Sequence, residues 1–577
     1  MEEHRQGRAI SRLPDWAVLL LFCLVFSFQV ILAATQKSAT FDEPANLVSG
    51  YVELRFGDYF MLARNLPFVK WLAALPLLFV DVKVPPAFPF THAWAFAQRF
   101  LYEVNDGDRL LLLGRLAVLP LSLLLGGLIF RWTQEFFGRP AGLLALFLYC
   151  FEPNLLAHAG LITTDLAVTL LMFGMVYGMY RVSRGGISLT CLLLPGVALG
   201  LALLTKYTMH PLVLILLLLA LVTSLSPRPL DVRLPGLPRV EVTGWGRKLA
   251  GFLLLFLGWS VIAYFLIWAA YRFRYEASLL HLDPLLPSQP FLRGVLLFAR
   301  DTRILPEAYI YGFLESLRDS GRYPAFLMGE VRLGSWWYYF LVTFFLKTPV
   351  SLLLLVLLAV GVQAKRWRET AERAAFLCLP VVVYFITISS SGYGIGHRHL
   401  LPIYPFLLVW VGGLVPWARQ SARGGRWVQG ALAALALWYA GGTVAIAPDY
   451  LAYFNELVGG PNQGYKYLVD SNLDWGQDLK GLKRYMDARG IDRVWLSYFG
   501  SASPEYYGIR YNLLPSYYML RRSREQVPTP FVAISATNLQ GVHLHAALGV
   551  STDFFKEFRD RQPIAKIGYS IFVYRLE

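Results

Sequence analysis

The sequence predicts an all-α polytopic membrane protein of about eleven transmembrane helices, followed by a small C-terminal α/β domain outside the membrane. Two observations predict this fold class. Hydrophobic residues make up 56% of the 577 positions and charged residues only 16%, with a mean hydropathy of +0.47. Apolar runs long enough to cross a membrane recur along residues 1–446, whereas 447–577 has the composition of a soluble domain.

Eleven apolar runs are the expected spans, because each comes close to the length that a membrane helix needs. They are 16–34, 110–131, 140–157, 161–180, 189–205, 210–224, 248–270, 338–361, 374–390, 399–416 and 427–446. The first run could also be a signal peptide, since Ala33 and Ala34 form a small-residue cleavage site. Its nineteen residues favour an uncleaved anchor.

Lysine and arginine recur in every second loop, which sets the expected orientation. They are Arg5, Arg8 and Arg12; Arg131 and Arg139; Arg181 and Arg184; Arg228, Arg233, Arg239, Arg247 and Lys248; Lys365, Arg366, Arg368 and Arg373; and Arg419, Arg423 and Arg426. The positive-inside rule then predicts a plasma (inner) membrane protein with its N-terminus in the cytoplasm and its C-terminus outside. The net charge of +15 is explained by this topology, so we expect no nucleic-acid partner.

Three segments are expected outside the membrane: 35–109, 271–337 and 447–577. The first contains a short apolar piece at 66–80, which we interpret as an interfacial or re-entrant helix. In the last, 475–490 predicts an amphipathic helix that ends at Gly490. The runs 493–500, 530–537 and 565–576 predict strands, which gives a small α/β domain.

An acidic pair, Asp42 and Glu43, follows the first span directly on the predicted outer side. Pro44 suits the first turn of a helix, so both carboxylates would lie at the positive end of its dipole, where the ionised form is favoured. They could simply cap this helix. Alternatively, Asp42 could act as a general base that removes a proton from an attacking hydroxyl or amine.

Other ionisable residues stand at span ends on the same predicted side: Asp165, Lys206, and the run His397, Arg398 and His399. Each has a simple structural interpretation, as a helix cap, a snorkelling lysine or a hydrated loop. Together they predict a functional site, because ionisable groups at membrane depth are costly. The cations suit a phosphate, and the amides that begin the tenth span would add to an anion site. A phosphate leaving group together with an activated nucleophile indicates transfer of a group from a phosphate-linked donor. Nucleotide sugars are absent outside the cytoplasm, so the donor on this side would be a lipid phosphate.

The sequence resembles the GT-C superfamily of membrane glycosyltransferases over roughly residues 15–450. Within it, the closest branch looks like the protein O-mannosyltransferase and lipid A aminoarabinose transferase group of glycosyltransferase family 39. The resemblance is carried by the Asp42–Glu43 pair and by later blocks in the family's order. These blocks are RNLPFVK (64–70), 114–165 ending in TTD, LALLTKYT (201–208), FLKTPVSLLLL (345–355) and GHRHLLPIYPF (396–406).

This resemblance implies a GT-C-like catalytic domain at 1–446 and a hexosyl- or pentosyltransferase activity. It implies a polyprenyl-phosphate sugar donor and a lipid, polysaccharide or protein acceptor at the membrane. By the same resemblance Asp42 is the catalytic base, with Glu43 and Asp165 as the other acidic site residues. The donor phosphate would be bound by Lys206, His397, Arg398, His399, Lys70 and Arg64. Only Pro67 stands where relatives often have paired prolines, which weakens the last two assignments.

Three questions stay open at the level of sequence. Asp42 and Asp165, with Glu43, could hold Mg²⁺ or Mn²⁺, because some enzymes of this superfamily use a divalent metal and others do not. The stretch 453–479, rich in Tyr, Asn, Trp and Asp, could bind the acceptor or be purely structural. The alternative functions are a secondary transporter, which would need an inverted repeat and charges near the midplane, and a receptor with an outer sensor domain.

Overall fold

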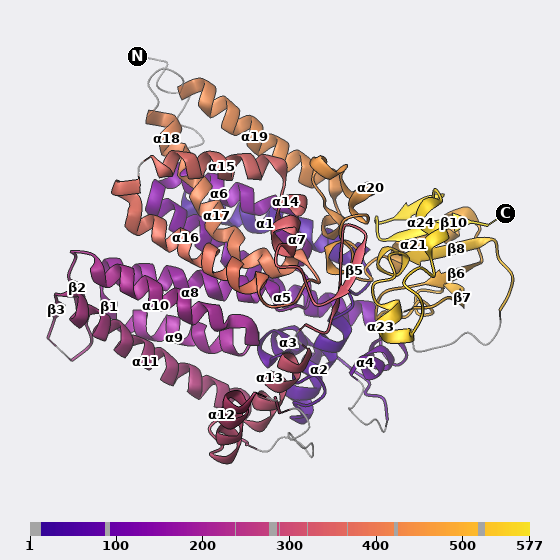
Figure 1. Ribbon diagram of the computed structural model, residues 1–577, viewed down its shortest axis with the longest axis horizontal. Helices are drawn as coiled ribbons and strands as arrows, with labels where there is room; N and C mark the ends of the chain where they lie inside the picture. The colour runs from indigo at the N-terminus through magenta and orange to yellow at the C-terminus, as the bar shows by residue number, and fades with distance from the viewer. Residues whose placement is uncertain are drawn as a thin grey trace.

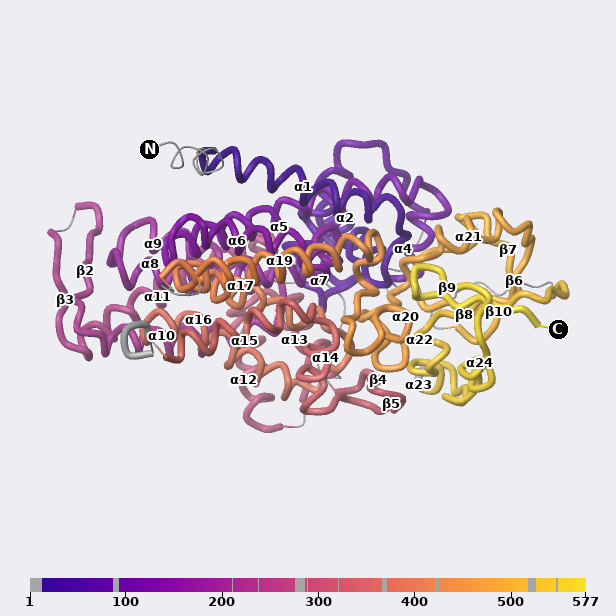
Figure 2. Tube along the Cα trace, turned by 90° about the horizontal axis from the view of Figure 1, so that it is seen from above, coloured from indigo at the N-terminus to yellow at the C-terminus, as the bar shows by residue number. Residues whose placement is uncertain are grey.

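A computed structural model describes residues 13–86, 93–236, 238–275, 286–287, 289–319, 321–365, 367–420, 425–516 and 526–576. Arg5, Arg8 and Arg12, which contribute to the predicted orientation, lie outside the described residues. The long helices run side by side along the longest axis of the molecule (Figure 1). The C-terminal sheet lies at one end of this bundle and a small sheet of β1–β3 at the other (Figures 1 and 2).

Eight described helical segments are long and apolar enough to cross a membrane. They are α1 (Asp15–Gln36), α5 (Gly107–Phe137), α8 (Asp165–Gly185), Tyr207–Leu225 (η4 and α10, His210–Leu225), α11 (Trp245–Ala270), Ala371–Ser389 of α16 (Trp367–Ser389), His397–Gln420 (η6, His397–Ile403; α17, Tyr404–Gly412; α18, Leu414–Gln420) and α19 (Gly425–Ile446). Two bent pairs raise this number to ten. The remaining predicted span, 189–205, is the shorter apolar helix α9 (Leu189–Leu203). The protein is therefore a multi-pass membrane protein, as its composition predicts.

The two bent pairs meet each other at the end of the bundle that faces the C-terminal sheet. In the first, α6 (Arg139–Cys150) turns by 65° into α7 (Pro153–Ala159); in the second, α14 (Tyr339–Lys347) turns by 111° into α15 (Val350–Ala364). Pro153 and Pro349 stand at these breaks, where proline restricts the preceding residue away from helical geometry. Asn154 donates to the Lys347 carbonyl at 2.8 Å, and the Lys347 ammonium donates to the Asn472 carbonyl at 2.6 Å. The breaks are thus stabilised by polar contacts rather than left open.

The segments expected outside the membrane contribute short helices that cover this end of the bundle. The first contains α2 (Glu43–Phe56), α3 (Pro67–Ala74), η3 (Leu75–Phe79) and α4 (Ala93–Tyr102), so the helix predicted at 66–80 is confirmed. The second contains α12 (Pro290–Asp301), α13 (Glu307–Asp319), β4 (Pro324–Leu327) and β5 (Glu330–Leu333). At the opposite end, β1 (Ile187–Ser188), β2 (Leu230–Arg233) and β3 (Val240–Val242) form the small sheet.

The C-terminal region is built around a five-stranded sheet in the order β7-β6-β8-β10-β9. The strands are β6 (Arg493–Ser497), β7 (Arg510–Leu513), β8 (Phe531–Ser535), β9 (Ala565–Ile567) and β10 (Ile571–Arg575). β6 pairs in parallel with β7 and β8, whereas β10 pairs antiparallel with β8 and β9. The helical elements are η7 (Tyr450–Ala452), η8 (Glu456–Val458), α20 (Pro461–Gly464), η9 (Asp470–Asn472), α21 (Leu479–Arg489), α22 (Ala536–Leu539), α23 (Leu544–Leu548) and α24 (Lys556–Asp560). The predicted α/β fold of this region is confirmed.

Two sequence predictions for this region need correction. The run 565–576 is a hairpin and not one strand, because Gly568 and Tyr569 adopt positive φ angles of 55° and 62° and reverse the chain. The helix predicted from residue 475 begins only at Leu479, since the preceding residues are paired with another part of the chain. Its predicted end is confirmed, with Gly490 in the left-handed conformation at φ 64°.

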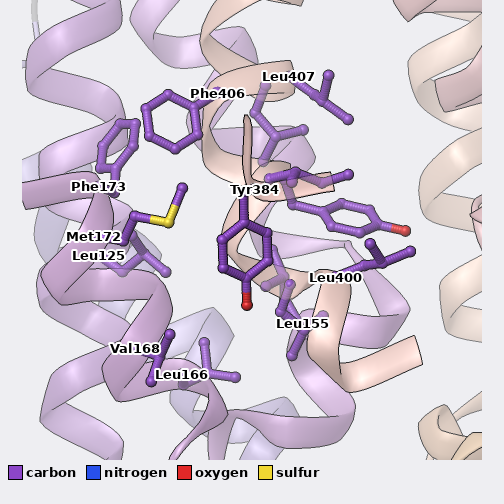
Figure 3. Close-up of a cluster of buried hydrophobic side chains, with 14 of the residues drawn as sticks. Leu125, Leu155, Leu166, Val168, Met172, Phe173, Tyr384, Leu400, Phe406 and Leu407 are labelled. Atoms are coloured by element: carbon purple, nitrogen blue, oxygen red, sulfur yellow. The ribbon is translucent and has the colours of Figure 1, made fainter. Parts of the chain in front are cut away.

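Large apolar side chains fill the space between the central helices. Phe173 and Met172 on α8 lie near Leu125 on α5, Phe406 on α17 and Tyr384 on α16 (Figure 3). Close packing of this kind resists displacement of one helix against another. The residues at the ends of α8 and η6 are therefore held at defined positions.

Candidate active site

A cavity of about 250 Å³ lies where the ends of α8, α9 and α16 meet the outer segments and the C-terminal region. Five of the residues predicted from the sequence line it: Asp42, Arg64, Lys206, Arg398 and His399. They come from four separate stretches of the chain, so the fold brings together side chains that the sequence keeps far apart.

Two carboxylates and two cations form a connected cluster at this cavity. Arg398 Nη1 lies 3.3 Å from Asp42 Oδ2 and 3.5 Å from Asp165 Oδ2. Lys206 Nζ lies 3.1 Å from Asp165 Oδ1 and 3.3 Å from His399 Nδ1. Asp165 itself is only 2% exposed and lies behind these cations. Its ion pairs with Lys206 and Arg398 hold these two cations at the cavity wall.

Asp42 occupies the N-cap position of α2, yet its side chain makes no capping hydrogen bond. Its carboxylate is instead directed at Arg398 and retains 26% of its surface exposed at the cavity. Burial raises the pKa of the Asp42 carboxyl above its ordinary value, and the nearby guanidinium groups of Arg398 and Arg64 oppose this rise. A carboxylate of raised pKa in a cavity fits a general base better than a helix cap.

Glu43, the neighbour of Asp42, points the other way and does not line the cavity. It is fully buried and accepts two hydrogen bonds from Arg115, with Nε at 2.8 Å from Oε1 and Nη2 at 2.6 Å from Oε2. It also accepts from the backbone amides of Thr40 at 2.8 Å and Ile162 at 3.2 Å. These contacts fix the start of α2 and leave Glu43 turned away from any bound substrate.

Two further residues predicted to bind the donor phosphate also lie away from the cavity lining. Lys70 is buried in an ion pair with Glu53 and donates to the Leu62 carbonyl at 3.2 Å. His397 Nε2 lies 2.7 Å from the Tyr404 hydroxyl, and His397 does not line the cavity, whereas His399 does. Adjacent residues of a helical turn point in different directions, which separates His397 from Arg398 and His399.

Arg64 is placed at the cavity by the second outer segment. Its guanidinium lies 3.0 Å from Asp319 Oδ2 and 3.0 Å from the Tyr323 hydroxyl, and its Cζ is 4.9 Å from the ring centre of Trp94. The cation–π contact and the ion pair hold the group at one orientation. The cavity therefore has a third cation in its lining, besides Lys206 and Arg398.

The C-terminal region supplies one wall of the cavity through Asp470, Trp475, Phe499 and His543. The Trp475 ring centre lies 4.2 Å from Arg398 Cζ. His543 Nε2 lies 2.9 Å from Asp470 Oδ2, and the imidazole stacks on Phe499 with a centroid separation of 5.1 Å and an interplanar angle of 2°. Asp470 and Trp475 fall in the stretch 453–479 that the sequence marks as rich in polar and aromatic residues. Nothing in the sequence marks Phe499 or His543.

Backbone pairing joins this wall to the segment that carries Asp42. Phe41 N donates to the Trp475 carbonyl at 2.8 Å, and Ser38 N donates to the Gln477 carbonyl at 2.9 Å. Ser471 Oγ donates to the Ile395 carbonyl at 2.7 Å, beside Gly396. A side chain at Gly396 would come within 2.1 Å of Ser471 Oγ, so this approach requires glycine. The C-terminal region thus positions both Asp42 and the segment that begins with His397.

Asp42 and Asp165, the residues predicted to hold a divalent cation, both lie next to Arg398. Within the described ranges, no group of three His, Cys, Asp or Glu side chains is placed to hold a metal ion. The Arg398 guanidinium lies between Asp42 and Asp165, where a bridging ion would have to bind. In this arrangement the arginine pairs with both carboxylates.

Some polar atoms at the cavity have no hydrogen-bond partner within the part of the chain that the structure describes. They are Thr163 Oγ1, Arg398 Nε and His399 Nε2, and all three are buried. Buried polar atoms are nearly always paired, and an unpaired one costs free energy. These atoms are consistent with a cavity built to receive a polar ligand.

Fold and site together define a multi-pass membrane protein with a charged, partly aromatic cavity at one end of its helical bundle. Residues 88–238, about a quarter of the chain, match the family model described as dolichyl-phosphate-mannose-protein mannosyltransferase. The resemblance predicted from the sequence is confirmed over this segment. A search of curated proteins returns no significant match.

Several solved structures are also similar to this chain. ArnT from Cupriavidus metallidurans in the apo state is 15% identical with a TM-score of 0.45, over 83% of this chain and 73% of that one. The same protein bound to undecaprenyl phosphate is 14% identical with a TM-score of 0.41, over 97% of both chains. The oligosaccharyltransferase of Archaeoglobus fulgidus in the apo form is 13% identical with a TM-score of 0.41, over 76% of this chain and 55% of that one.

Proposed function

We propose that this protein is a glycosyltransferase that moves a sugar from a polyprenyl-phosphate-linked donor to an acceptor on the extracytoplasmic side of the membrane. The observation that carries the proposal is the placement of the Asp42 carboxylate at a cavity whose wall holds Lys206, Arg398 and His399. The family model that matches residues 88–238 supports the lipid-phosphate donor. A transporter would need its charges near the bilayer midplane, whereas this cluster lies at the ends of α8 and η6.

In the proposed reaction, the donor phosphate binds beside Lys206 and Arg398 through charge-assisted hydrogen bonds. The phosphate competes with Asp42 for the Arg398 guanidinium and so releases the carboxylate. Asp42 then takes the proton of an acceptor hydroxyl or amine as that atom forms a bond to the anomeric carbon. The bond from the anomeric carbon to the phosphate oxygen breaks, and its electron pair leaves with the polyprenyl phosphate. The two cations stabilise the negative charge that develops there.

The acceptor is placed on the wall that the C-terminal region contributes. His543 and Asp470 can exchange hydrogen bonds with a polar acceptor group. Phe499, which stacks on His543, and Trp475, which lies against Arg398, provide apolar ring surface at the same wall. Pockets of this kind fix a ligand by a few polar contacts on an apolar background. A lipid, polysaccharide or protein acceptor would each present such a group.

The direct test of this function compares the cell-envelope glycans and glycoproteins of cells with and without the gene by mass spectrometry. A sugar modification that disappears with the gene, and that returns with the purified protein and the matching polyprenyl-phosphate sugar, is the expected result. Solute uptake into proteoliposomes, without any sugar transfer, would instead identify a transporter.

Substitution of Lys206 by alanine is expected to weaken productive donor binding, because the donor phosphate loses a charge-assisted partner. One such hydrogen bond contributes about 1.5–3 kcal/mol, so kcat/KM for the lipid donor should fall roughly 10–100-fold. The matched control is Lys483→Ala, which removes a lysine paired with Asp487 on α21 outside the cavity lining. Donor kinetics equal to the parent's in both variants would remove Lys206 from the phosphate site.

Chelation is expected to leave transfer unchanged, because Arg398 already occupies the position between the two carboxylates. The measurement is sugar transfer by the purified protein before and after treatment with EDTA. Inhibition that is reversed by Mg²⁺ or Mn²⁺, but not by Ca²⁺, would show that Arg398 moves aside and that Asp42 and Asp165 bind a metal.

The proposed orientation places the cavity and the C-terminal region outside and the N-terminus in the cytoplasm. A membrane-impermeant thiol reagent should then label Asp492→Cys in intact cells but not Lys365→Cys, in a background without the four native cysteines. Both positions are exposed, so access is decided by the side of the membrane. Labelling of Lys365→Cys alone would invert the topology and the proposed side of the reaction.

A further inference from the structure

A second cavity, of about 450 Å³, opens at the end of the bundle opposite the active site. It lies where the last turns of α5, α8 and α15 meet the start of α16 and helix α18. These ends gather on the side of the bundle away from the C-terminal sheet (Figure 1). Helix α8 connects the two cavities, with Asp165 at its first residue and Arg184 in its last turn. Its 21 residues span about 30 Å, which is the thickness of the hydrocarbon core.

The second cavity has more arginine side chains than carboxylates in its described lining. Among the residues that the structure describes, Arg184, Arg228 and Arg373 line it together with one carboxylate, Glu372. Arg184 Nη2 lies 3.7 Å and Arg228 Nη1 lies 3.9 Å from the same oxygen of Glu372. One carboxylate cannot neutralise three guanidinium groups, so the described part of the lining carries an excess of two positive charges. Such an excess attracts an anion into the cavity.

The arginines are held in place by neighbouring groups. Arg184 Cζ lies 5.6 Å from the ring centre of Tyr180, and Arg373 Cζ lies 5.9 Å from that of Phe136. Lys248 donates to the backbone carbonyl of Arg228 at 3.1 Å, which fixes the chain after α10. Guanidinium groups that are already oriented lose less entropy when they bind a ligand.

The rest of the lining is apolar and aromatic. It includes Phe136 and Phe137 at the end of α5, Val362 on α15 and Trp417 on α18. Tryptophan at this depth is typical of the membrane–water interface. A ligand that fills the cavity therefore has an anionic part, for the arginines, and an apolar part.

We propose that this cavity binds the phosphate-ester headgroup of an anionic phospholipid from the leaflet opposite the active site. Arginine binds phosphate oxygens in a bidentate manner, and the aromatic wall suits the glycerol and upper acyl chain. Basic pockets between helices at the membrane surface have the chemistry that anionic headgroups require. The proposal depends only on the helices crossing a membrane, so it stands or falls independently of the glycosyltransferase activity.

The test measures lipid retention by the full-length protein in native mass spectrometry, after detergent exchange with added phosphatidylglycerol or phosphatidylcholine. The parent should retain phosphatidylglycerol in preference to phosphatidylcholine. The double variant Arg184→Gln, Arg228→Gln should retain it about 10–30-fold less tightly, because it loses two charges at the headgroup. Glu372→Gln should have the opposite effect and tighten retention, since it removes the carboxylate that competes with the lipid phosphate.

The matched control is Arg233→Gln, Arg239→Gln. It removes two exposed arginines from the small sheet at the same end, both paired with Asp231 outside the cavity lining. An equal loss in this control would show that surface charge alone attracts the lipid and would overturn the proposal. Equal retention of phosphatidylcholine by the parent would overturn it too. Binding of glycerol 3-phosphate as tightly as the lipid would assign the cavity to a soluble phosphate ester instead.

Protein folding is checked by size-exclusion chromatography and thermal unfolding of each variant. If the double variant does not fold, Arg373→Gln carries the same test, because this exposed arginine lines the cavity without an ion pair to Glu372 among the described contacts. Unchanged preference for phosphatidylglycerol in a folded Arg373→Gln protein, together with unchanged retention in Glu372→Gln, would rule out the headgroup site.

Discussion

Replacement of Asp42 by asparagine is expected to lower sugar transfer by about 10²–10⁴-fold, which is the contribution of general-base catalysis. Asparagine keeps the size of the side chain and can occupy the same N-cap position, so the folded protein should accumulate at the parental level. The substitution removes the basic oxygen that would accept the proton, and it also removes the negative charge that pairs with Arg398. The measurement is initial rate with saturating donor, normalised to folded protein.

The pH dependence of sugar transfer tests the role of the Asp42 carboxylate independently. Because burial raises the pKa of Asp42, transfer by the parent should fall on acidification at a pH above the ordinary titration range of aspartate. The residual activity of Asp42→Asn should not show this fall. Asp108→Asn is the matched control, since Asp108 is an outer carboxylate paired with Lys480 at 2.9 Å and lies outside the cavity lining. A folded and fully active Asp42→Asn protein would end the catalytic assignment.

Replacement of Glu43 by glutamine is expected to destabilise the protein by about 3–5 kcal/mol without abolishing the chemistry. The loss arises because Arg115 would remain buried, at 3% exposure, without a counter-charge. Arg115 also donates to the backbone carbonyls of Ala34 at 2.7 Å and Ser38 at 2.9 Å, so it links α5 to the end of α1. We expect less folded protein and a lower unfolding temperature, while each folded molecule transfers sugar at nearly the parental rate.

The control for this substitution is Glu103→Gln, which breaks an exposed pair with Arg99 and should change stability by less than about 1 kcal/mol. Burial alone would raise the pKa of Glu43, but the contact with Arg115 outweighs it and lowers the pKa below the usual value. The stabilisation from this pair is therefore present above the ordinary glutamate pKa and is lost only as the pH falls through the lowered one. A stable Glu43→Gln protein without activity would return Glu43 to the catalytic residues.

The membrane spans could be predicted from the sequence because the hydrocarbon core restricts the structures that a chain can adopt there. Unpaired backbone groups are costly in hydrocarbon, so each long apolar run must form a helix. The two bends could not be predicted in the same way. They depend on Asn154, Lys347 and Asn472, whose contacts join parts of the chain that hydropathy treats separately.

The sequence could predict candidate site residues only where the predicted order of spans places them at span ends on the same side. Asp42, Asp165, Lys206, Arg398 and His399 all stand at span ends on one side, and they form one cluster in the structure. The sequence could not distinguish these residues from their neighbours Glu43 and His397, because that choice depends on which way each turn of helix faces. It also could not place Phe499 and His543, which reach the cavity from β-rich structure late in the chain.

The pairing of residues 38–41 with 475–479 has a consequence for biosynthesis. The segment before Asp42 leaves the ribosome near the start of translation, yet its backbone partners are made after the last span. A growing chain can therefore insert all its helices while the base and the acceptor wall are still apart. On the proposed orientation and function, we expect transfer to begin only when the final segment has crossed the membrane and paired with residues 38–41, so a chain truncated before residue 475 should not use the lipid donor.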